Sequence, residues 1–522
     1  MGKKRIEKLL SVDPIGAFDK IKSNYLRYFK TAYKFRETSS PLYDDFSYLN
    51  ERLYGSDANN EHTPGLIEED GNLYKEPFCE LLPEYESAGQ KLEDLVKKDS
   101  SIKWPAHFSE FISRGLMKPS DPSRPYIPYA HQYEMLKLAF GHRKNVVITS
   151  GTGSGKTESF MLPLFASLLQ EASKWKQQNY NPVWYAQRNQ NGEYDNPYQR
   201  LGETRPAALR ALILYPMNAL VNDQMSRLRQ ALDSEDIRSF FDDIKYGYKG
   251  NRIFFGRYNG ETIGARDQDL AGSESMKKCA RELSDIVYQS INISRKISGK
   301  DLDADAEFVA PRFSDDPNQN KIGSEMLTRW DMQSYPPDVL ITNVSMLSIA
   351  LVRSYEDSIF ENTKDYYKNN PDAVFHLIVD ELHLHRGTAG SEVACLLRMF
   401  LERIGVPPTI KDAEGRTVAN PRLRILASSA SLGDDSEAFL EEFFGVYNED
   451  QTPAFTIIGA NSDLCVKDNS LSINYNDFCP FATHHDPLGL RYVDDGFSDS
   501  LLIKNTLAQK YGCANIEEFI KQ

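Results

Sequence analysis

A glycine-rich segment at residues 150–157 carries the clearest chemistry in this sequence. Its residues are Ser150, Gly151, Thr152, Gly153, Ser154, Gly155, Lys156 and Thr157. An apolar, β-branched run precedes it at 145–149, and apolar residues at helical spacing follow it between Phe160 and Leu169. A strand, a glycine-rich turn and a helix form the context of a phosphate-binding loop, in which backbone N–H groups and the positive end of the helix surround an anion. The segment therefore predicts a site for a nucleoside triphosphate.

The last two residues of the segment have distinct tasks at such a site. Lys156 is placed to reach the β- and γ-phosphates, and the Thr157 hydroxyl is placed to bind Mg²⁺. Ser150 stands where the general pattern has glycine. A glycine-rich turn without a ligand is the alternative, and the flanking strand and helix argue against it. ATP and Mg²⁺ are the expected cofactors.

A pair of carboxylates supplies the second half of the predicted site. Asp380 and Glu381 come directly after the apolar run at 377–379. In an open α/β sheet, the end of a strand directs its side chains into the crevice where phosphates bind. We expect Asp380 to hold Mg²⁺ and Glu381 to orient and deprotonate the attacking water. The alternative for an Asp-Glu pair is a solvated charge pair, which the preceding apolar strand disfavours.

The histidines and cysteines form no metal-binding pattern. His383 and His385 follow the carboxylates, but His376 lies at the opposite end of the strand and no third ligand stands nearby. The six cysteines are far apart and include no CxxC pair, so neither a zinc site nor a disulfide framework is predicted.

The arrangement of apolar runs predicts the elements that position these residues. Short apolar strands alternate with helical patterns, which favours an α/β fold with a mainly parallel sheet covered on both faces. The expected strands are 145–149, 211–215, 253–255, 339–342, 377–380 and 424–428. The expected domains are a helical N-terminal accessory region at 1–120, a core at 121–435 with polar insertions at about 175–206 and 264–330, and a mixed tail at 436–522.

Short segments at the ends of these strands resemble the motifs of superfamily 2 DEAD/DEAH (DExH) helicases. The segments at 150–157 and 380–383 are similar to motifs I and II, and 128–132 resembles the adenine-reading Q segment. The segment at 215–224 resembles motif Ia, and the segment at 256–262 resembles the threonine-glycine turn. Further along the chain, 342–347 resembles motif Ib and 428–431 resembles motif III. The resemblance implies a RecA-like P-loop NTPase core that hydrolyses ATP and acts as a helicase on nucleic acid.

The resemblance also implies roles for single residues. Gln132 would contact the adenine edge, while His383, Ser429 and Ser431 would couple the nucleotide site to the neighbouring motifs. Small, hydroxyl and amide residues at strand ends can bind a sugar-phosphate backbone without reading bases. The residues implied to contact nucleic acid are Pro216, Asn218, Gln224, Tyr258, Gly260, Thr342 and Asn343.

Longer phrases narrow the resemblance. Residues 215–224, 329–333, 336–343 and 380–393 are similar to large bacterial DEAD/DEAH helicases of phage-defence systems of the DISARM and Druantia type. This likeness favours DNA over RNA, a role in antiviral defence, and other subunits of a defence system as partners.

Length and charge bound the remaining possibilities. A chain of 522 residues is too long for one hydrophobic core, and its net charge of −14 means that any nucleic-acid surface must be local. No apolar run reaches the roughly 18 residues of a membrane span, and Met1–Arg5 leads into no signal-type apolar core. We therefore expect a cytoplasmic protein without a membrane partner.

The sequence shows only one motor core. Nothing after Ser431 resembles a second RecA-like core, and no Gln-x-x-Gly-Arg-x-x-Arg stretch supplies an arginine finger, which is typically worth about 10³–10⁵ in rate. We expect weak hydrolysis unless a second core acts in cis or in trans. A nucleotide-gated nucleic-acid sensor or scaffold without unwinding activity is the alternative. A P-loop kinase fits less well, because it leaves the segments resembling motifs Ia, Ib and III unexplained.

Overall fold

The structure is a computed structural model that describes most of residues 84–463. The described residues are 56–58, 61–64, 84–119, 125–151, 153–176, 199–200, 203–264, 281–283, 285–286, 290, 311, 323–385, 387–430, 432, 436–460, 462–463 and 509. The chain divides into two compact units, Met1–Glu84 with Asp463–Gln522, and Tyr85–Ser462. In the first unit, strands β1 (Ser56–Ala58) and β2 (Glu61–Thr63) form an antiparallel pair. The predictions for the rest of that unit fall almost wholly outside the described residues.

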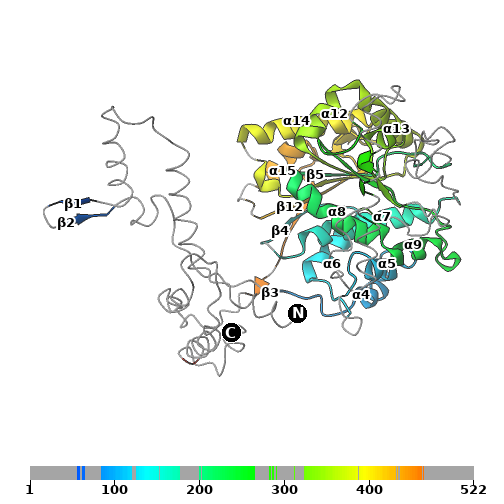
Figure 1. Cartoon of the computed structure of the whole chain (residues 1–522), viewed down its shortest axis with the longest axis horizontal. Coiled ribbons are helices and arrows are strands. Elements are labelled where there is room, and N and C mark those ends of the chain that lie inside the picture. The colour runs from blue at the N-terminus through cyan, green and yellow to red at the C-terminus, as the bar shows by residue number, and fades with distance from the viewer. Residues whose placement is uncertain are drawn as a thin grey trace. The chain divides into compact units, whose positions relative to one another are not determined.

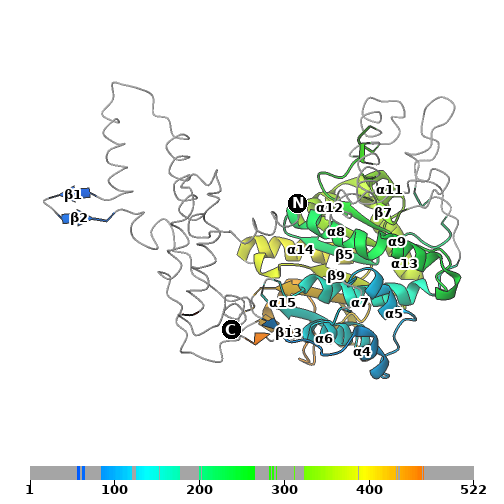
Figure 2. The same ribbon diagram turned by 60° about the horizontal axis from the view of Figure 1, so that its bottom comes forward.

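The second unit is built on an eight-stranded sheet with the order β13-β4-β12-β9-β5-β8-β6-β7, in which every recorded pairing is parallel. Its strands are β4 (Asn145–Thr149), β5 (Ala211–Tyr215), β6 (Phe255–Tyr258), β7 (Glu325–Met326), β8 (Val339–Asn343), β9 (Phe375–Val379), β12 (Leu423–Ser429) and β13 (Phe455–Gly459). Figure 2 shows β13 and β7 at opposite ends of the sheet. Two short pairs, β3 (Glu84–Tyr85) with β14 (Ser462–Asp463) and β10 (Thr409–Lys411) with β11 (Thr417–Ala419), stand outside it.

Helices cover both faces of the sheet (Figure 1). One face packs against α4 (Leu92–Lys98), α5 (Phe108–Arg114), α6 (Ala130–Leu136), α7 (Lys156–Ala172), α8 (Asn218–Asp233) and α9 (Glu235–Asp242). The other face packs against α12 (Val344–Val352), α13 (Asp357–Asn369), α14 (Gly387–Arg403) and α15 (Ser436–Phe444). Helix α11 (Arg329–Ser334) precedes β8, and short helical turns are η1 (Lys137–Gly141), η3 (Ile244–Tyr246), η5 (Ser354–Glu356) and η6 (Leu382–Leu384).

The central strands are largely apolar on both sides because their successive residues enter two different cores. Val146 and Ile148 of β4 pack with α7 and its neighbours, whereas Val147 between them packs with the α12–α15 side. This alternation is the two-residue period of a strand, and burial of both faces explains why the strands read as continuous apolar runs. The predicted α/β fold with a mainly parallel sheet is confirmed.

The boundaries of this unit lie outside the expected core. Helices α4 and α5 join the apolar core of α7 and α9, so the boundary that we expected near residue 120 falls inside the unit. At the other end, α15 and β13 extend the fold beyond residue 435, and β13 adds an edge strand beside β4. Among the described residues of the first insertion, Trp175, Gln199, Arg200 and Arg205 are buried, whereas Lys176, Thr204 and Pro206 are exposed.

A buried ion cluster fastens the chain at the start of β8. Asp338 is fully buried, and its two carboxylate oxygens each accept a 2.8 Å bond from Arg205. Arg210, which precedes β5, lies 3.1 Å from the same carboxylate, and the backbone N–H of Phe254 donates to it at 2.8 Å. Although burial opposes the charge, the arginines of this cluster lower the pKa of Asp338 to about 2. The carboxylate of Asp338 therefore joins the end of the first insertion to the starts of β5, β6 and β8.

We predict that Asp338→Asn lowers the free energy of unfolding by about 3–5 kcal/mol, because it removes the charge of the buried carboxylate that Arg205 and Arg210 share. Urea denaturation monitored by fluorescence measures the change. Asp357→Asn is the matched control, because Asp357 pairs with Arg403 at a partly exposed position and should cost no more than about 1 kcal/mol. A loss as small as that of the control would contradict a structural role for the cluster.

A second buried titratable group lies in β9. His376 is 3% exposed, and its Nε2 lies 3.1 Å from the hydroxyl of Ser167. Burial, with repulsion from Arg424, lowers the pKa of His376 to about 3. The folded protein therefore holds this imidazole neutral, whereas the unfolded chain protonates it near its ordinary value of 6.5.

Because protonation favours the unfolded state, the stability that His376 provides is complete above pH 6.5 and is lost as the pH falls from there toward 3. We expect the free energy of unfolding to drop by about 2 kcal/mol on this account between pH 6.5 and pH 5. Urea titrations at several pH values across that range should show that the free energy of unfolding falls less steeply with decreasing pH in His376→Asn than in the unmodified chain. His142→Asn, at an exposed position, should keep the original slope. An unchanged slope in His376→Asn would refute the assignment.

Candidate functional site

The predicted phosphate loop connects the end of β4 to the start of α7. Gly153 and Gly155 have φ angles of 78° and 71°, a left-handed conformation that side chains disfavour. A Cβ atom on Gly155 would also lie 2.3 Å from Nε2 of Gln132. Glycine is therefore required at position 155 by both conformation and space, and the chain enters α7 with its first backbone N–H groups directed into the loop.

Serine at the first position of the loop makes a bond that glycine cannot make. The hydroxyl of Ser150 lies 2.6 Å from that of Ser154, which in turn donates to the carbonyl of Gly151 at 3.0 Å. The backbone N–H of Ser150 donates to the carbonyl of Ser429 at 3.1 Å. These bonds brace the loop from within and tie it to β12. Thr152, also predicted to bind ATP, lies outside the described residues.

The Q-like segment binds the loop from the side. Gln132 is fully buried, its Nε2 donates to the carbonyl of Gly155 at 3.1 Å, and its Oε1 accepts from the N–H of Tyr129 at 2.9 Å. The neighbouring His131 places Nε2 2.8 Å from the carbonyl of Ser154, which requires this nitrogen to carry the proton. Burial lowers the pKa of His131, which favours its neutral form. Sequence reasoning missed His131, since only the folded chain brings it to the loop.

The two halves of the site meet across 225 residues of sequence. Nζ of Lys156 lies 3.4 Å from Oε1 of Glu381. Asp380 is held next to them, because its carboxylate accepts from the hydroxyl of Ser428 and, at 2.9 Å, from the N–H of Glu381. The pairing of Ala427 with Val379 and of Ser429 with Thr149 brings these strand ends to one edge.

Asp380 has the environment of a cation ligand. Burial, with repulsion from Glu381, raises its pKa despite the bond from Ser428. A carboxylate in such a place gains from a positive charge beside it. The carboxylate of Asp380 and the hydroxyl of Thr157 are both hard oxygen donors of the kind that Mg²⁺ prefers.

His383 has two neighbours for one nitrogen. Its Nδ1 lies 3.3 Å from the N–H of Ala430 and 3.3 Å from Oε2 of Glu381. An Nδ1 without a proton accepts from Ala430, whereas an Nδ1 that carries a proton donates to Glu381, so this nitrogen can satisfy only one of them at a time. The ring thus lies beside both Glu381 and the backbone at the end of β12, and its coupling role stays a prediction. Ser429 is buried in β12, and Ser431 lies outside the described residues.

Three asparagines meet at the same edge of the sheet. Oδ1 of Asn218, the first residue of α8, accepts from Nδ2 of Asn259 at 3.2 Å and from Nδ2 of Asn343. Asn343 also caps α12, because its Oδ1 accepts from the N–H of Met346 at 2.7 Å. Asn218 is exposed, and both lone pairs of its oxygen are used, so its amide nitrogen is the group that it can offer to a ligand. Asn259 carried no signal of its own in the sequence.

The other residues predicted to contact nucleic acid fall into two groups, one accessible to solvent and one buried. Gly260 is exposed and Pro216 is half-buried. The side chains of Tyr258 and Thr342 are each 2% exposed and bond within the protein. Tyr258 donates to Glu356 at 2.6 Å, and Thr342 donates to the carbonyl of Tyr258, also at 2.6 Å.

Gln224 lies away from that surface. Its side chain is 6% exposed, and its Nε2 is 3.4 Å from the hydroxyl of Thr157. The structure thus places this residue beside the nucleotide loop.

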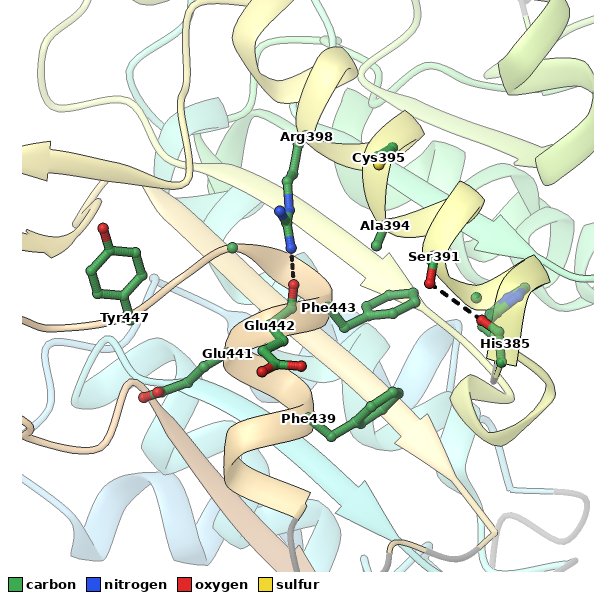
Figure 3. A pocket seen from close by; sticks show the side chains of 13 residues that line it. His385, Ser391, Ala394, Cys395, Arg398, Phe439, Glu441, Glu442, Phe443 and Tyr447 are labelled. Atoms are coloured by element: carbon green, nitrogen blue, oxygen red, sulfur yellow. Dashed lines mark hydrogen bonds between the residues drawn. The ribbon is translucent and has the colours of Figure 1, made fainter.

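A separate cavity of about 840 Å³ lies between α14 and α15. Figure 3 shows Phe439 and Phe443 extending from α15 and Arg398 extending from α14, where it donates to the carbonyl of Glu442. His385 reaches this cavity and not the nucleotide loop. Within the described ranges, no group of three or more His, Cys, Asp or Glu side chains is arranged to hold a metal ion. In the same ranges no helix has the length and apolarity needed to cross a bilayer.

Comparison with known proteins agrees with the motifs. Residues 129–253 match the DEAD/DEAH box helicase family. The Druantia protein DruE of Escherichia coli (strain UMEA 4076-1) is 29% identical over 410 residues, covering 73% of this chain and 20% of DruE. The chain therefore spans about a fifth of the length of this curated relative. The resemblance inferred from the sequence is confirmed.

Solved structures of helicases are also similar. DUF1998 helicase MrfA bound to DNA and AMPPNP is 17% identical with a TM-score of 0.36, over 73% of this chain and 31% of MrfA. A DEAD box protein from the hyperthermophile Methanococcus jannaschii is 14% identical with a TM-score of 0.25, over 68% of this chain and 53% of that protein.

Proposed function

Because this chain carries a DEAD/DEAH box helicase domain, we propose that it is the first motor core of an ATP-dependent DNA helicase or translocase. The observation that carries the proposal is the 3.4 Å approach of Lys156 to Glu381, with Asp380 beside them. A phosphate-binding lysine, a cation-binding carboxylate and a candidate base converge on one edge of the sheet, where ligands bind in open α/β folds.

The residues of this edge divide the work of phosphoryl transfer. Backbone N–H groups of 153–155 and the N-terminus of α7 would hold the phosphates, and Lys156 would exchange Glu381 for a phosphate oxygen. Thr157 and Asp380 would hold Mg²⁺, which when bound neutralises charge on the phosphates. Glu381, released from Lys156, is then the nearest carboxylate to orient and deprotonate water.

A second set of groups at this edge of the sheet could bind a single strand of nucleic acid. The N-termini of α8 and α12 lie side by side at the asparagine group, and helix N-termini attract phosphates. Asn218 and Gly260 are exposed there. Tyr258 and Thr342 are buried beneath this surface, where the bond from Thr342 to the carbonyl of Tyr258 would hold the turn at Gly260 in place. None of these contacts would read bases, so the strand would be bound without regard to sequence.

The wider assignment rests on relatives. Likeness to the Druantia protein DruE supports a role in antiphage defence. The resemblance of the motifs favours DNA as the strand and other defence subunits as partners. We also propose that full turnover requires a second RecA-like core, in cis or in trans, to supply the arginine finger. A nucleotide-gated sensor would bind both ligands without turnover even when that core is present.

We predict that Glu381→Gln keeps nucleotide binding but lowers DNA-stimulated ATP turnover by at least about 100-fold, because general-base catalysis contributes roughly 10²–10⁴. Phosphate release with and without single-stranded DNA measures turnover, and a fluorescent ATP analogue measures binding. Glu392→Gln makes the same change at an exposed site on α14 and should leave turnover intact. Turnover near the original rate in Glu381→Gln would exclude this carboxylate as the base.

We predict that Asn218→Asp weakens binding of single-stranded DNA by at least about tenfold. The substitution keeps the oxygen that Asn259 and Asn343 hold, but it replaces an N–H donor by a negative charge facing the phosphates. Fluorescence anisotropy at fixed salt measures the affinity. Asn369→Asp adds the same charge at the end of α13 and serves as the control. Equal affinities of the two variants would remove Asn218 from the strand-binding surface.

A further inference from the structure

Gln224 occupies a place that its expected role does not explain. Its side chain is 6% exposed, so it offers little to a strand in solvent, and its Nε2 is 3.4 Å from the hydroxyl of Thr157. Its Oε1 is buried and has no hydrogen-bond partner among the described residues. A buried amide oxygen without a partner is costly, which marks the position as one where a second arrangement is favourable.

The hydroxyl that Gln224 contacts is the one proposed to bind Mg²⁺. An oxygen bound to a cation becomes a poorer acceptor and its O–H a better donor. Thr157 in that state would no longer favour the N–H of Gln224 and would favour an acceptor in its place. A half-turn of the amide exchanges Nε2 for Oε1 and gives the unpartnered oxygen that role. Gln224 thus has two arrangements, chosen by the state of Thr157.

Helix α8 connects this contact to the strand-binding surface. Gln224 lies about 1.7 turns from Asn218, the exposed first residue of the same helix. A second link joins the same two helices, because Arg227 of α8 pairs with Glu158 of α7 at 2.5 Å. Both links attach α8 to the first turn of α7, directly after the phosphate loop.

We propose that Gln224 is a positioning residue that couples occupancy of the nucleotide site to the affinity of the nucleic-acid surface. It acts through Thr157 at one end and through α8 and Asn218 at the other. This inference rests on the proposed function, since it requires that both ligands bind. It assigns to Gln224 a task between the two sites and not a contact with the strand.

The test measures coupling as the ratio of the DNA dissociation constant without the nucleotide analogue and Mg²⁺ to the dissociation constant with them. The dissociation constant for a single-stranded DNA oligonucleotide is determined by anisotropy for the full chain, with and without Mg²⁺ and a non-hydrolysable ATP analogue. Coupling between sites is typically about fivefold to 150-fold. We expect a ratio in this range for the unmodified chain and a ratio within about twofold of one for Gln224→Met, which keeps volume but removes the amide.

Gln230→Met is the matched control, since it makes the same change about 1.7 turns further along α8. It should retain the original ratio. Hydrogen exchange at the first turn of α8 gives a readout without DNA: the analogue should change exchange in the unmodified chain and in Gln230→Met, and not in Gln224→Met. Melting temperatures check folding, and Gln224→Leu replaces Gln224→Met if the latter does not fold.

The outcomes separate the inference from the proposed function. An unmodified ratio of one with both ligands bound, or a Gln224→Met ratio equal to the original, would overturn the inference and leave the proposed function standing. Failure of the unmodified chain to bind the Mg²⁺–analogue complex would overturn the proposed function, and the inference with it. Loss of coupling confined to Gln224→Met would support both.

Discussion

The parallel pairing of β12 with both β4 and β9 is the constraint on which the rest of the structure depends. It brings the ends of three strands from distant parts of the chain to one edge, so that Ser429 bonds to Ser150 and Ser428 bonds to Asp380. A slip of one residue would turn each side chain to the other face of the sheet. The register therefore decides whether phosphate loop and carboxylates share one site.

At the opposite edge of the sheet, buried ion pairs add to apolar packing and hold the starts of β5, β6 and β8 together. Asp338 stands directly before β8, and the arginines around it belong to the first insertion and to the segment before β5. Buried charges that must meet allow few alternative arrangements, because any mispairing leaves one of them uncompensated. One end of the sheet is thus fixed by ion pairs, which leaves the other end free to be built from loops and ligand-binding groups.

Much of this could be predicted from the sequence, where the signal is local. The phosphate loop, the strand before Asp380 and the central strands follow from apolar runs and glycine spacing, which depend on neighbouring residues. Strand β13 was missed because it is an edge strand with alternating exposure, and α15 was left in the tail with it. The two-residue strand β7 is too short to give any pattern.

Side-chain partnerships in the site required the fold. His131 and Asn259 lie inside segments that resemble motifs. They bond, however, to Ser154 and Asn218, which are remote in sequence, so the sequence pattern assigns them no role. Gln224 shows the opposite case. The motif resemblance implies a contact with nucleic acid, whereas in the structure the side chain is buried next to Thr157. Sequence patterns identify which segments meet at an edge, and only tertiary contacts decide which atom of each segment faces the ligand.

The paired hydroxyls of Ser150 and Ser154 have a consequence for the energetics of ligand capture. A loop of glycines has many conformations, and a ligand that selects one of them must offset the lost entropy. Here the loop is already braced by its own hydroxyls and by the carbonyl of Ser429, so part of that ordering is complete before any anion arrives. Capture of phosphates would then carry a smaller entropic penalty, and the loop would behave as a rigid receptor rather than one that folds around its ligand.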